Sequence, residues 1–350
     1  MYLKALPLLL AVLWLPAAVA DAPRTGEFGT SFTQTTPLAD GGEVLKRLLH
    51  PLVYDQWQAA GRIKPGQTID PTQETWQVYV PSDYDGSQAY GVLVWVSWGP
   101  DGRMEGNWRR EFREHKLIYI GADKSGNYDS VPGRRVPLAL TGLINIEAQY
   151  KIDPARIYIA GFSGGGVTAS RIAAAYSDVF TGGLFVSTSN GLGSHDVPVP
   201  PLERYSLMRS RGRYVFTSGE EETSNLIINA RSVSQYRALC VSRVDYIHIP
   251  NASHRDIDSR IFDHAMTYLD TPPAVDPAAQ ADCEKNLADR RTQAVEQVNQ
   301  ALAADDKDKA WSQLQEFSME FGPMAEPEFT RIATCIAQFV SIQGCTAGAT

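Results

Sequence analysis

Short β-rich runs alternate with helical stretches along residues 75–270, and this alternation constrains the fold more than any other feature. Residues 92–96 are almost wholly apolar, as in a strand buried on both faces, and 76–80 alternate, as in a strand with one buried face. We expect further strands at 117–120, 156–160, 183–187, 214–217 and 244–249, and helices at 43–58 (interrupted at Pro51), 138–150, 167–176, 226–239 and 260–269. Helices between successive strands imply crossover connections. The sequence therefore predicts an α/β fold with a mainly parallel central sheet flanked by helices.

Composition and charge argue against one functional class, the nucleic-acid-binding proteins. The chain has 350 residues, of which 43% are hydrophobic and 21% charged, as in an ordinary globular protein. Its net charge of −8 argues against binding to a phosphate backbone, which needs a basic surface. We therefore expect no nucleic-acid partner.

The first twenty residues resemble a secretory signal peptide. Lys4 gives a positive start, 8–15 form a short apolar run, and 18–20 supply small residues at a cleavage site before Asp21. The alternative is a membrane anchor, but the run is shorter than the roughly 20 residues that span a bilayer. No later segment is apolar enough to span. We expect a secreted or periplasmic protein without a membrane span.

A proline-rich break divides the rest of the chain. Beyond it, residues 278–340 are almost all helix formers, and we expect two or three helices there. This helical appendage carries no evident chemistry, and a protein partner or self-association is its expected role. The expected organisation is a signal peptide (1–20), an N-terminal segment (21–74), a catalytic α/β domain (75–270), a linker (271–277) and a helical C-terminal appendage (278–350).

All four cysteines lie in the C-terminal third of the chain, at 240, 283, 335 and 345. Export favours disulfides, and four cysteines allow three pairings between which the sequence does not choose. A bridge from Cys240 would tie the appendage to the main domain, whereas Cys283–Cys335 would lock the appendage to itself. A zinc site is the alternative, but the sequence has no C-x-x-C spacing.

Residues 161–165 read Gly-Phe-Ser-Gly-Gly and match G-x-S-x-G. A buried strand precedes them and a helix follows, which is the setting of a nucleophile elbow. A serine in so sharp a turn is strained, and the glycines at −2 and +2 let strand and helix approach. A phosphate-binding loop is the alternative, but neither of its usual glycine patterns is present. Ser163 is therefore the candidate nucleophile.

A serine nucleophile needs a base and an acid that orients the base, and in such folds they follow it in the order acid, then histidine. His254 follows the last expected strand and is the candidate base, whereas His248 lies inside that strand, where a core histidine is the commoner case. The acid is expected among Glu220, Glu221 and Glu222. Glu222 is preferred because it lies three residues beyond the strand-ending glycine.

The oxyanion of the reaction needs two N–H donors. One is expected from Gly164, the residue after the nucleophile. The other is expected from the loop after strand 92–96, at Trp98 or Gly99, since Pro100 has no N–H. Trp98 could also line the acyl pocket, the alternative being ordinary core packing.

The run 150–166, Tyr-Lys-Ile-Asp-Pro-Ala-Arg-Ile-Tyr-Ile-Ala-Gly-Phe-Ser-Gly-Gly-Gly, resembles that of exported α/β-hydrolases related to poly(3-hydroxybutyrate) depolymerases and feruloyl esterases. The run 121–127, Gly-Ala-Asp-Lys-Ser-Gly-Asn, adds to the resemblance. It covers about residues 75–270 and implies ester hydrolysis through an acyl-enzyme. The chain departs from that family in lacking a His-Gly oxyanion loop and in offering glutamate as the acid.

The leading hypothesis is therefore a serine esterase acting on a small-molecule or polymeric ester, with no metal and no organic cofactor. A serine exopeptidase with the same triad is the first alternative, since elbow serines recur in peptidases of this fold. A catalytically silent protein that keeps the hydrolase fold for binding is the second.

Overall fold

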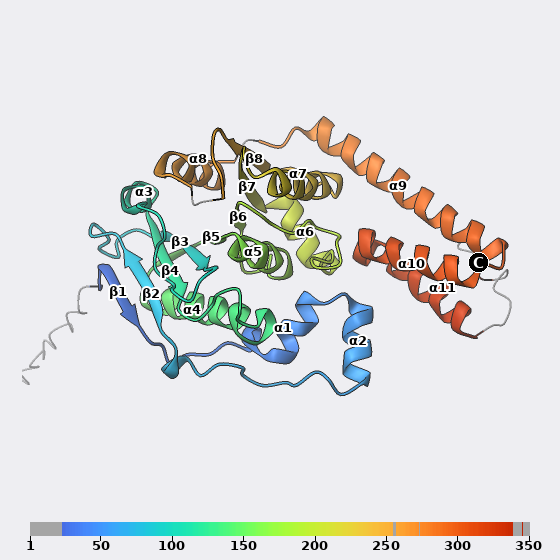
Figure 1. Cartoon of the computed structure of the whole chain (residues 1–350), viewed down its shortest axis with the longest axis horizontal. Coiled ribbons are helices and arrows are strands. Elements are labelled where there is room, and N and C mark those ends of the chain that lie inside the picture. The colour runs from blue at the N-terminus through green and yellow to red at the C-terminus, as the bar shows by residue number, and fades with distance from the viewer. Residues whose placement is uncertain (1–22, 255–256, 273, 339–344, 346–350) are drawn as a thin grey trace, which may run out of the picture.

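A single eight-stranded sheet forms the centre of the protein (Figure 1). The computed structural model describes residues 23–254, 257–272, 274–338 and 345. The strand order is β1-β2-β4-β3-β5-β6-β7-β8. β1 and β2 run antiparallel to their neighbours, and all pairings from β4 to β8 are parallel. The strands are β1 Gly26–Thr30, β2 Trp76–Val80, β3 Tyr90–Val96, β4 Leu117–Ala122, β5 Ile152–Phe162, β6 Gly182–Val186, β7 Arg213–Gly219 and β8 Val244–Ile249.

Helices cover both faces of the sheet. The α-helices are α1 Gly41–Leu48, α2 Pro51–Ala59, α3 Arg109–Glu114, α4 Val136–Gln149, α5 Gly164–Ala175, α6 Leu202–Ser210, α7 Thr223–Ala238, α8 Ser259–Asp270, α9 Pro277–Ala303, α10 Lys307–Phe321 and α11 Glu326–Gln338. Short 3-10 turns occur at Pro37–Ala39 (η1), Pro71–Gln73 (η2) and Gly322–Met324 (η4), and a π-helical turn at Val131–Arg135 (η3).

Two hydrophobic clusters lie on opposite faces of the sheet. α3 and α8 contribute Phe112 and Phe262 to one cluster, whereas α4 and α5 contribute Leu140 and Ile172 to the other. Alternate residues of β3 enter the two clusters, so this strand is buried throughout, as its apolar sequence predicts. The sequence-based fold class is confirmed: the sheet is mainly parallel, with helices on both faces and a helical region at the C-terminal end.

The C-terminal helices pack against the chain's own α/β region. In Figure 1, α9, α10 and α11 lie together at the end of the molecule next to α6. The disulfide Cys240–Cys283 joins α9 to the segment after α7, and Arg290 Nη2 donates to the Ala238 carbonyl oxygen at 2.6 Å. Nothing in the described part of the chain supports a protein partner for these helices.

The second disulfide joins Cys335 to Cys345, so all four cysteines are paired. This is one of the three pairings that the sequence left open, and its Cys240–Cys283 bridge ties the appendage to the main domain. The zinc alternative is excluded because a disulfide sulfur is no longer a thiolate ligand.

The expected signal peptide, residues 1–20, lies outside the described residues. Within the residues that are described, no helix is both long and apolar enough to cross a membrane.

Candidate active site

Ser163 stands between β5 and α5 in a strained backbone conformation, with φ 54° and ψ −126°. Strand and helix meet so closely here that a Cβ on Gly161 would lie 2.4 Å from the carbonyl carbon of Gly165. A Cβ on Gly165 would lie 2.1 Å from the Val96 carbonyl oxygen. The two glycines of the motif therefore permit the turn, and the turn places the serine at the carboxyl end of the sheet and the N-terminus of α5.

The structure brings Ser163, His254 and Glu222 together, although they lie far apart in the sequence. His254 Nε2 is 2.9 Å from Ser163 Oγ, and His254 Nδ1 is hydrogen-bonded to Glu222 Oε1. Because a carboxylate only accepts, Nδ1 carries the proton and Nε2 is left as the acceptor for the serine hydroxyl. This is the arrangement expected of a nucleophile, a base and an orienting acid.

The loops after β7 and β8 are joined to each other, which explains how acid and base meet. The Glu221 N–H donates to the Ala252 carbonyl oxygen at 2.9 Å, and Glu220 Oε2 accepts from the Asn251 N–H at 3.0 Å. Glu220 and Glu221 are both exposed, whereas Glu222 is 8% exposed. Of the three acidic candidates, the structure therefore brings only Glu222 to His254.

Hydrogen bonds hold Glu222 in its ionised form. Burial alone would raise the pKa of this carboxyl, but donors around it lower the pKa below its ordinary value. Ser187 Oγ donates at 2.7 and 2.8 Å to the two oxygens, and Asn225 Nδ2 and the Gly219 N–H each donate at 2.8 Å. His254 provides the remaining donor.

A second buried layer supports these donors. Ser187 follows β6 with φ 72°, and its carbonyl oxygen accepts from Asn229 Nδ2 at 3.1 Å. The same Asn229 amide donates to the Thr217 carbonyl oxygen at 3.0 Å and to Ser218 Oγ at 2.8 Å. Sequence reasoning missed Ser187 and Asn229, because isolated polar residues in a strand end and a helix carry no pattern that reveals a shared contact.

Among the other histidines, His248 corrects a sequence-based expectation. It is exposed and not in the core, because it lies on β8, the edge strand of the sheet. Its ring lies 4.2 Å, centroid to centroid, from that of Tyr246. His115 contacts Asp270 and Asp263 at 2.9 and 3.0 Å. Neither histidine is among the residues hydrogen-bonded to Ser163.

The expected oxyanion donors occupy the elbow and the loop after β3. Gly164 is the first residue of α5, so its N–H has no acceptor within the helix. The Gly99 N–H donates to Ser97 Oγ at 3.1 Å, which leaves Trp98 as the candidate whose N–H is not engaged in this way. The sequence offers no reason to choose between the Trp98 and Gly99 N–H groups, and in the structure they differ in this hydrogen bond.

The Trp98 side chain lies at the surface, 49% exposed, and not in the core. Its ring packs edge-on against Phe162, at 6.5 Å between centroids, and Phe162 in turn lies 4.9 Å from the His254 ring. Trp98 Nε1 donates to Glu105 Oε2 at 3.1 Å. Glu105 also accepts from Trp95 Nε1 at 3.3 Å, so one carboxylate holds the loop from two sides.

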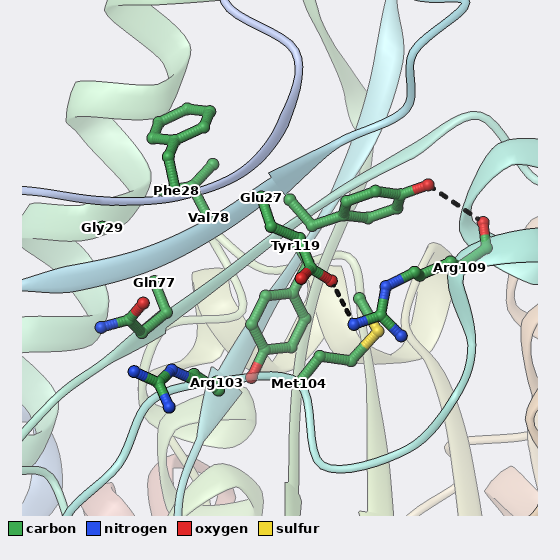
Figure 2. Close-up of a pocket in the computed structure, with 10 residues that line it drawn as sticks. Glu27, Phe28, Gly29, Gln77, Val78, Arg103, Met104, Arg109 and Tyr119 are labelled. Atoms are coloured by element: carbon green, nitrogen blue, oxygen red, sulfur yellow. Dashed lines mark hydrogen bonds and ion pairs between the residues drawn. The ribbon is translucent and has the colours of Figure 1, made fainter.

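A cavity of about 250 Å³ lies beside β1 and β2, away from the residues of the triad (Figure 2). Arg103 and Met104 line it, and both belong to the loop that carries Trp98. Figure 2 shows Arg109 next to Glu27, with which it pairs at 2.5 Å. The Tyr79 hydroxyl donates to the Arg109 carbonyl oxygen at 3.3 Å. The charges in this cavity are thus largely paired within the protein. Among the described residues, no group of three or more His, Cys, Asp or Glu side chains is placed to hold a metal ion.

The sheet is mainly parallel, a strained serine stands between strand and helix, and the acid and the histidine follow later strands. Together these features define the α/β-hydrolase fold. The chain is similar in structure to S-formylglutathione hydrolase FrmB from Staphylococcus aureus (13% identity, TM-score 0.44, 59% of this chain and 96% of that one). It is also similar to a ferulic acid esterase (13%, 0.43, 69% and 95%) and to Est1E from Butyrivibrio proteoclasticus (14%, 0.38, 55% and 91%). No family model and no curated protein matches the sequence. These likenesses concern the fold alone.

Proposed function

We propose that the protein is a serine esterase that hydrolyses carboxylic esters through an acyl-enzyme on Ser163. The observation that carries the proposal is the continuous hydrogen-bonded chain from Ser163 through His254 to Glu222. A strained serine at a helix N-terminus, paired with an oriented histidine, is built for nucleophilic attack on an acyl carbon. No cofactor is needed for this chemistry.

Acylation follows from the contacts of the three side chains. His254 Nε2 takes the proton of Ser163 as Oγ bonds to the ester carbonyl carbon, and the ionised Glu222 stabilises the imidazolium that forms. The carbonyl oxygen becomes an oxyanion, which the N–H groups of Gly164 and Trp98 stabilise. His254 then gives its proton to the alcohol oxygen as the ester C–O bond breaks.

Deacylation repeats the sequence with water. His254 Nε2 takes a proton from water as the water oxygen attacks the acyl carbon, and the proton returns to Ser163 Oγ when the acid leaves. The half-exposed His254 side chain leaves the site open to water. Residues 75–270 form the catalytic unit in this proposal, and 278–350 an appendage that takes no part in the chemistry.

We further propose that the protein works outside the cytoplasm, as a secreted or periplasmic enzyme. Two disulfides support this, since such bonds persist in oxidising compartments. Mass spectrometry of the protein from its native host tests the proposal: the expected mature chain begins at Asp21, and an intact Met1 in a cytoplasmic fraction would contradict it.

Labelling with a fluorophosphonate probe tests the catalytic proposal. The full mature chain should react covalently, and Ser163→Ala and His254→Ala should abolish the reaction while circular dichroism shows a folded protein. A folded, oxidised wild-type protein that is not labelled would refute the proposal and favour a silent binding protein.

The acid assignment has matched controls in the neighbouring glutamates. Glu222→Gln should lower kcat/KM on p-nitrophenyl acetate by about 10³–10⁴-fold, since loss of the triad acid leaves the imidazole without its orienting charge. Glu221→Gln should leave it within about twofold. A matched pair of ester and amide substrates then distinguishes an esterase from an exopeptidase, because an esterase should hydrolyse only the ester at a measurable rate.

A further inference from the structure

Arg135 is a buried cation that touches three loops of the candidate active site. It lies at the junction of η3 and α4 and is 3% exposed. Its Nε donates to the Ser125 carbonyl oxygen at 2.9 Å, and its Nη2 donates to the carbonyl oxygens of Ser97 and Gly164 at 2.8 and 3.1 Å. One side chain therefore connects the loop after β4, the loop after β3 and the nucleophile elbow.

No ion pair among the described residues includes this guanidinium. Burial lowers the pKa of Arg135 to about 10, and the charge of Asp129 opposes that shift only in part. The group is still cationic at neutral pH. A buried charge whose hydrogen bonds go to carbonyl dipoles keeps a strong field, because no carboxylate bonds to it directly.

The bond to Ser97 has a direct link to the oxyanion site. The Ser97 carbonyl and the Trp98 N–H are the two ends of one peptide group, and this N–H is the proposed oxyanion donor of the loop after β3. A cation bonded to the carbonyl polarises the peptide and strengthens its N–H as a donor. Both this bond and the bond to Gly164 also fix the distance between the loop and the elbow.

We propose that Arg135 is a positioning residue of the hydrolysis, which holds the Trp98 N–H in place and polarises it toward the oxyanion. This inference rests on the proposed esterase function. It assigns to Arg135 a contribution that grows as negative charge develops on the carbonyl oxygen, so the residue acts on the transition state more than on the bound ester.

The test compares Arg135→Gln and Arg135→Lys with the control Arg134→Gln. Arg134 is the neighbouring arginine, but it binds the Glu74 carboxylate at 2.8 and 2.9 Å and contacts neither Ser97 nor Gly164. Rates on p-nitrophenyl acetate are divided by the concentration of Ser163 that a fluorophosphonate titrates, so that partial unfolding does not enter the comparison.

We expect Arg135→Gln to lower kcat per active site by about 10–100-fold with KM within threefold, because one oxyanion donor is worth about 10²–10³-fold and here it is weakened but not removed. Affinity for a trifluoromethyl ketone, whose adduct carries the oxyanion, should fall by the same factor. The pH dependence of kcat/KM should keep its midpoint. Arg135→Lys should recover part of the rate, and Arg134→Gln should match the wild type.

If the wild-type protein is labelled and hydrolyses the ester, two results would still overturn the role proposed for Arg135. One is an unchanged rate per titrated Ser163 in Arg135→Gln. The other is the loss of all folded protein in both Arg135 variants, which would make the guanidinium a requirement of the fold. Absence of labelling and hydrolysis in the wild type would instead remove the proposed function, and the inference with it.

Discussion

The hydroxyl of Ser187 offers a clean way to measure what the surroundings of Glu222 contribute. Ser187 is 1% exposed, and its Oγ donates to both carboxylate oxygens at 2.7 and 2.8 Å. Ser187→Ala keeps the Cβ and the strained backbone and removes one oxygen atom. The change therefore deletes the hydroxyl hydrogen bond that the two carboxylate oxygens share, together with a 3.3 Å contact to His254 Nδ1, and it keeps the path of the chain.

The expected cost at pH 7 is about 2 kcal/mol of unfolding free energy, since a hydrogen bond to a charged group contributes about 1.5–3 kcal/mol. Three donors to the carboxylate remain, so kcat/KM should fall only about tenfold. The stabilisation depends on pH. Because the folded-state pKa of Glu222 is lowered, its contribution is present above the unfolded value of about 4.3 and is lost as pH falls through the folded value.

Urea unfolding at a series of pH values from 8 down to 3 provides the assay. The difference between wild type and Ser187→Ala should shrink in the acid range, because removing the donor raises the pKa of Glu222 toward its ordinary value. Ser177→Ala is the matched control: Ser177 is 2% exposed and donates to the neutral Arg204 carbonyl oxygen at 2.9 Å. It should cost about 1 kcal/mol at every pH and leave the rate unchanged. A Ser187→Ala difference as flat with pH as that of Ser177→Ala would refute the reasoning.

Three further perturbations have expected outcomes. Burial alone would lower the pKa of His115, but two aspartates raise it above 6.5. The stability that His115 adds is therefore fully present below pH 6.5 and is lost as the pH rises through its pKa in the folded protein. The gap in unfolding free energy between wild type and His115→Gln should therefore narrow from pH 6 to pH 9, and a gap that widens would contradict this. Gly165→Ala should lower the unfolding free energy by more than about 3 kcal/mol or prevent folding, because the new Cβ would lie 2.1 Å from a backbone oxygen. Gly164→Ala should lower it by about 1 kcal/mol or less, because its Cβ meets an exposed side chain. Thermal melts of the two variants provide the comparison. Replacing Cys240 and Cys283 by alanine should lower the unfolding free energy by about 4 kcal/mol, the loop entropy of a 43-residue separation, and an unchanged guanidinium midpoint would show that the bridge adds nothing.

The sheet was largely predictable because its strands carry local patterns. β3 and the second half of β5 are apolar runs, and all seven expected strands are present. β1 was missed because Gly26–Thr30 contains two glycines and a charge, and only its pairing with β2 makes it a strand. α3 and α6 were missed as well, since they are short and their sequences are dominated by charged and polar residues.

The residues that meet at the candidate site were predictable to the extent that they follow strand ends. Ser163, Glu222 and His254 all do, and chain order identified them. Arg135 and Ser187 were not predictable, because each acts through contacts that form only when distant segments fold together. Their partners are separated by 38 and 35 residues, and no local pattern records such pairs.

The interlocked loops after β7 and β8 also have a consequence for folding. Ser163 follows β5, Ser187 follows β6, and the acid and the histidine follow β7 and β8, so the four groups meet only when four neighbouring parallel strands are in register. Ser163 and His254 are 91 residues apart, and closing a chain segment of that length is slow compared with local structure formation. Reactivity of the serine during refolding therefore reports completion of this half of the sheet, and a timed pulse of an active-site probe could count the molecules in which β8 has docked.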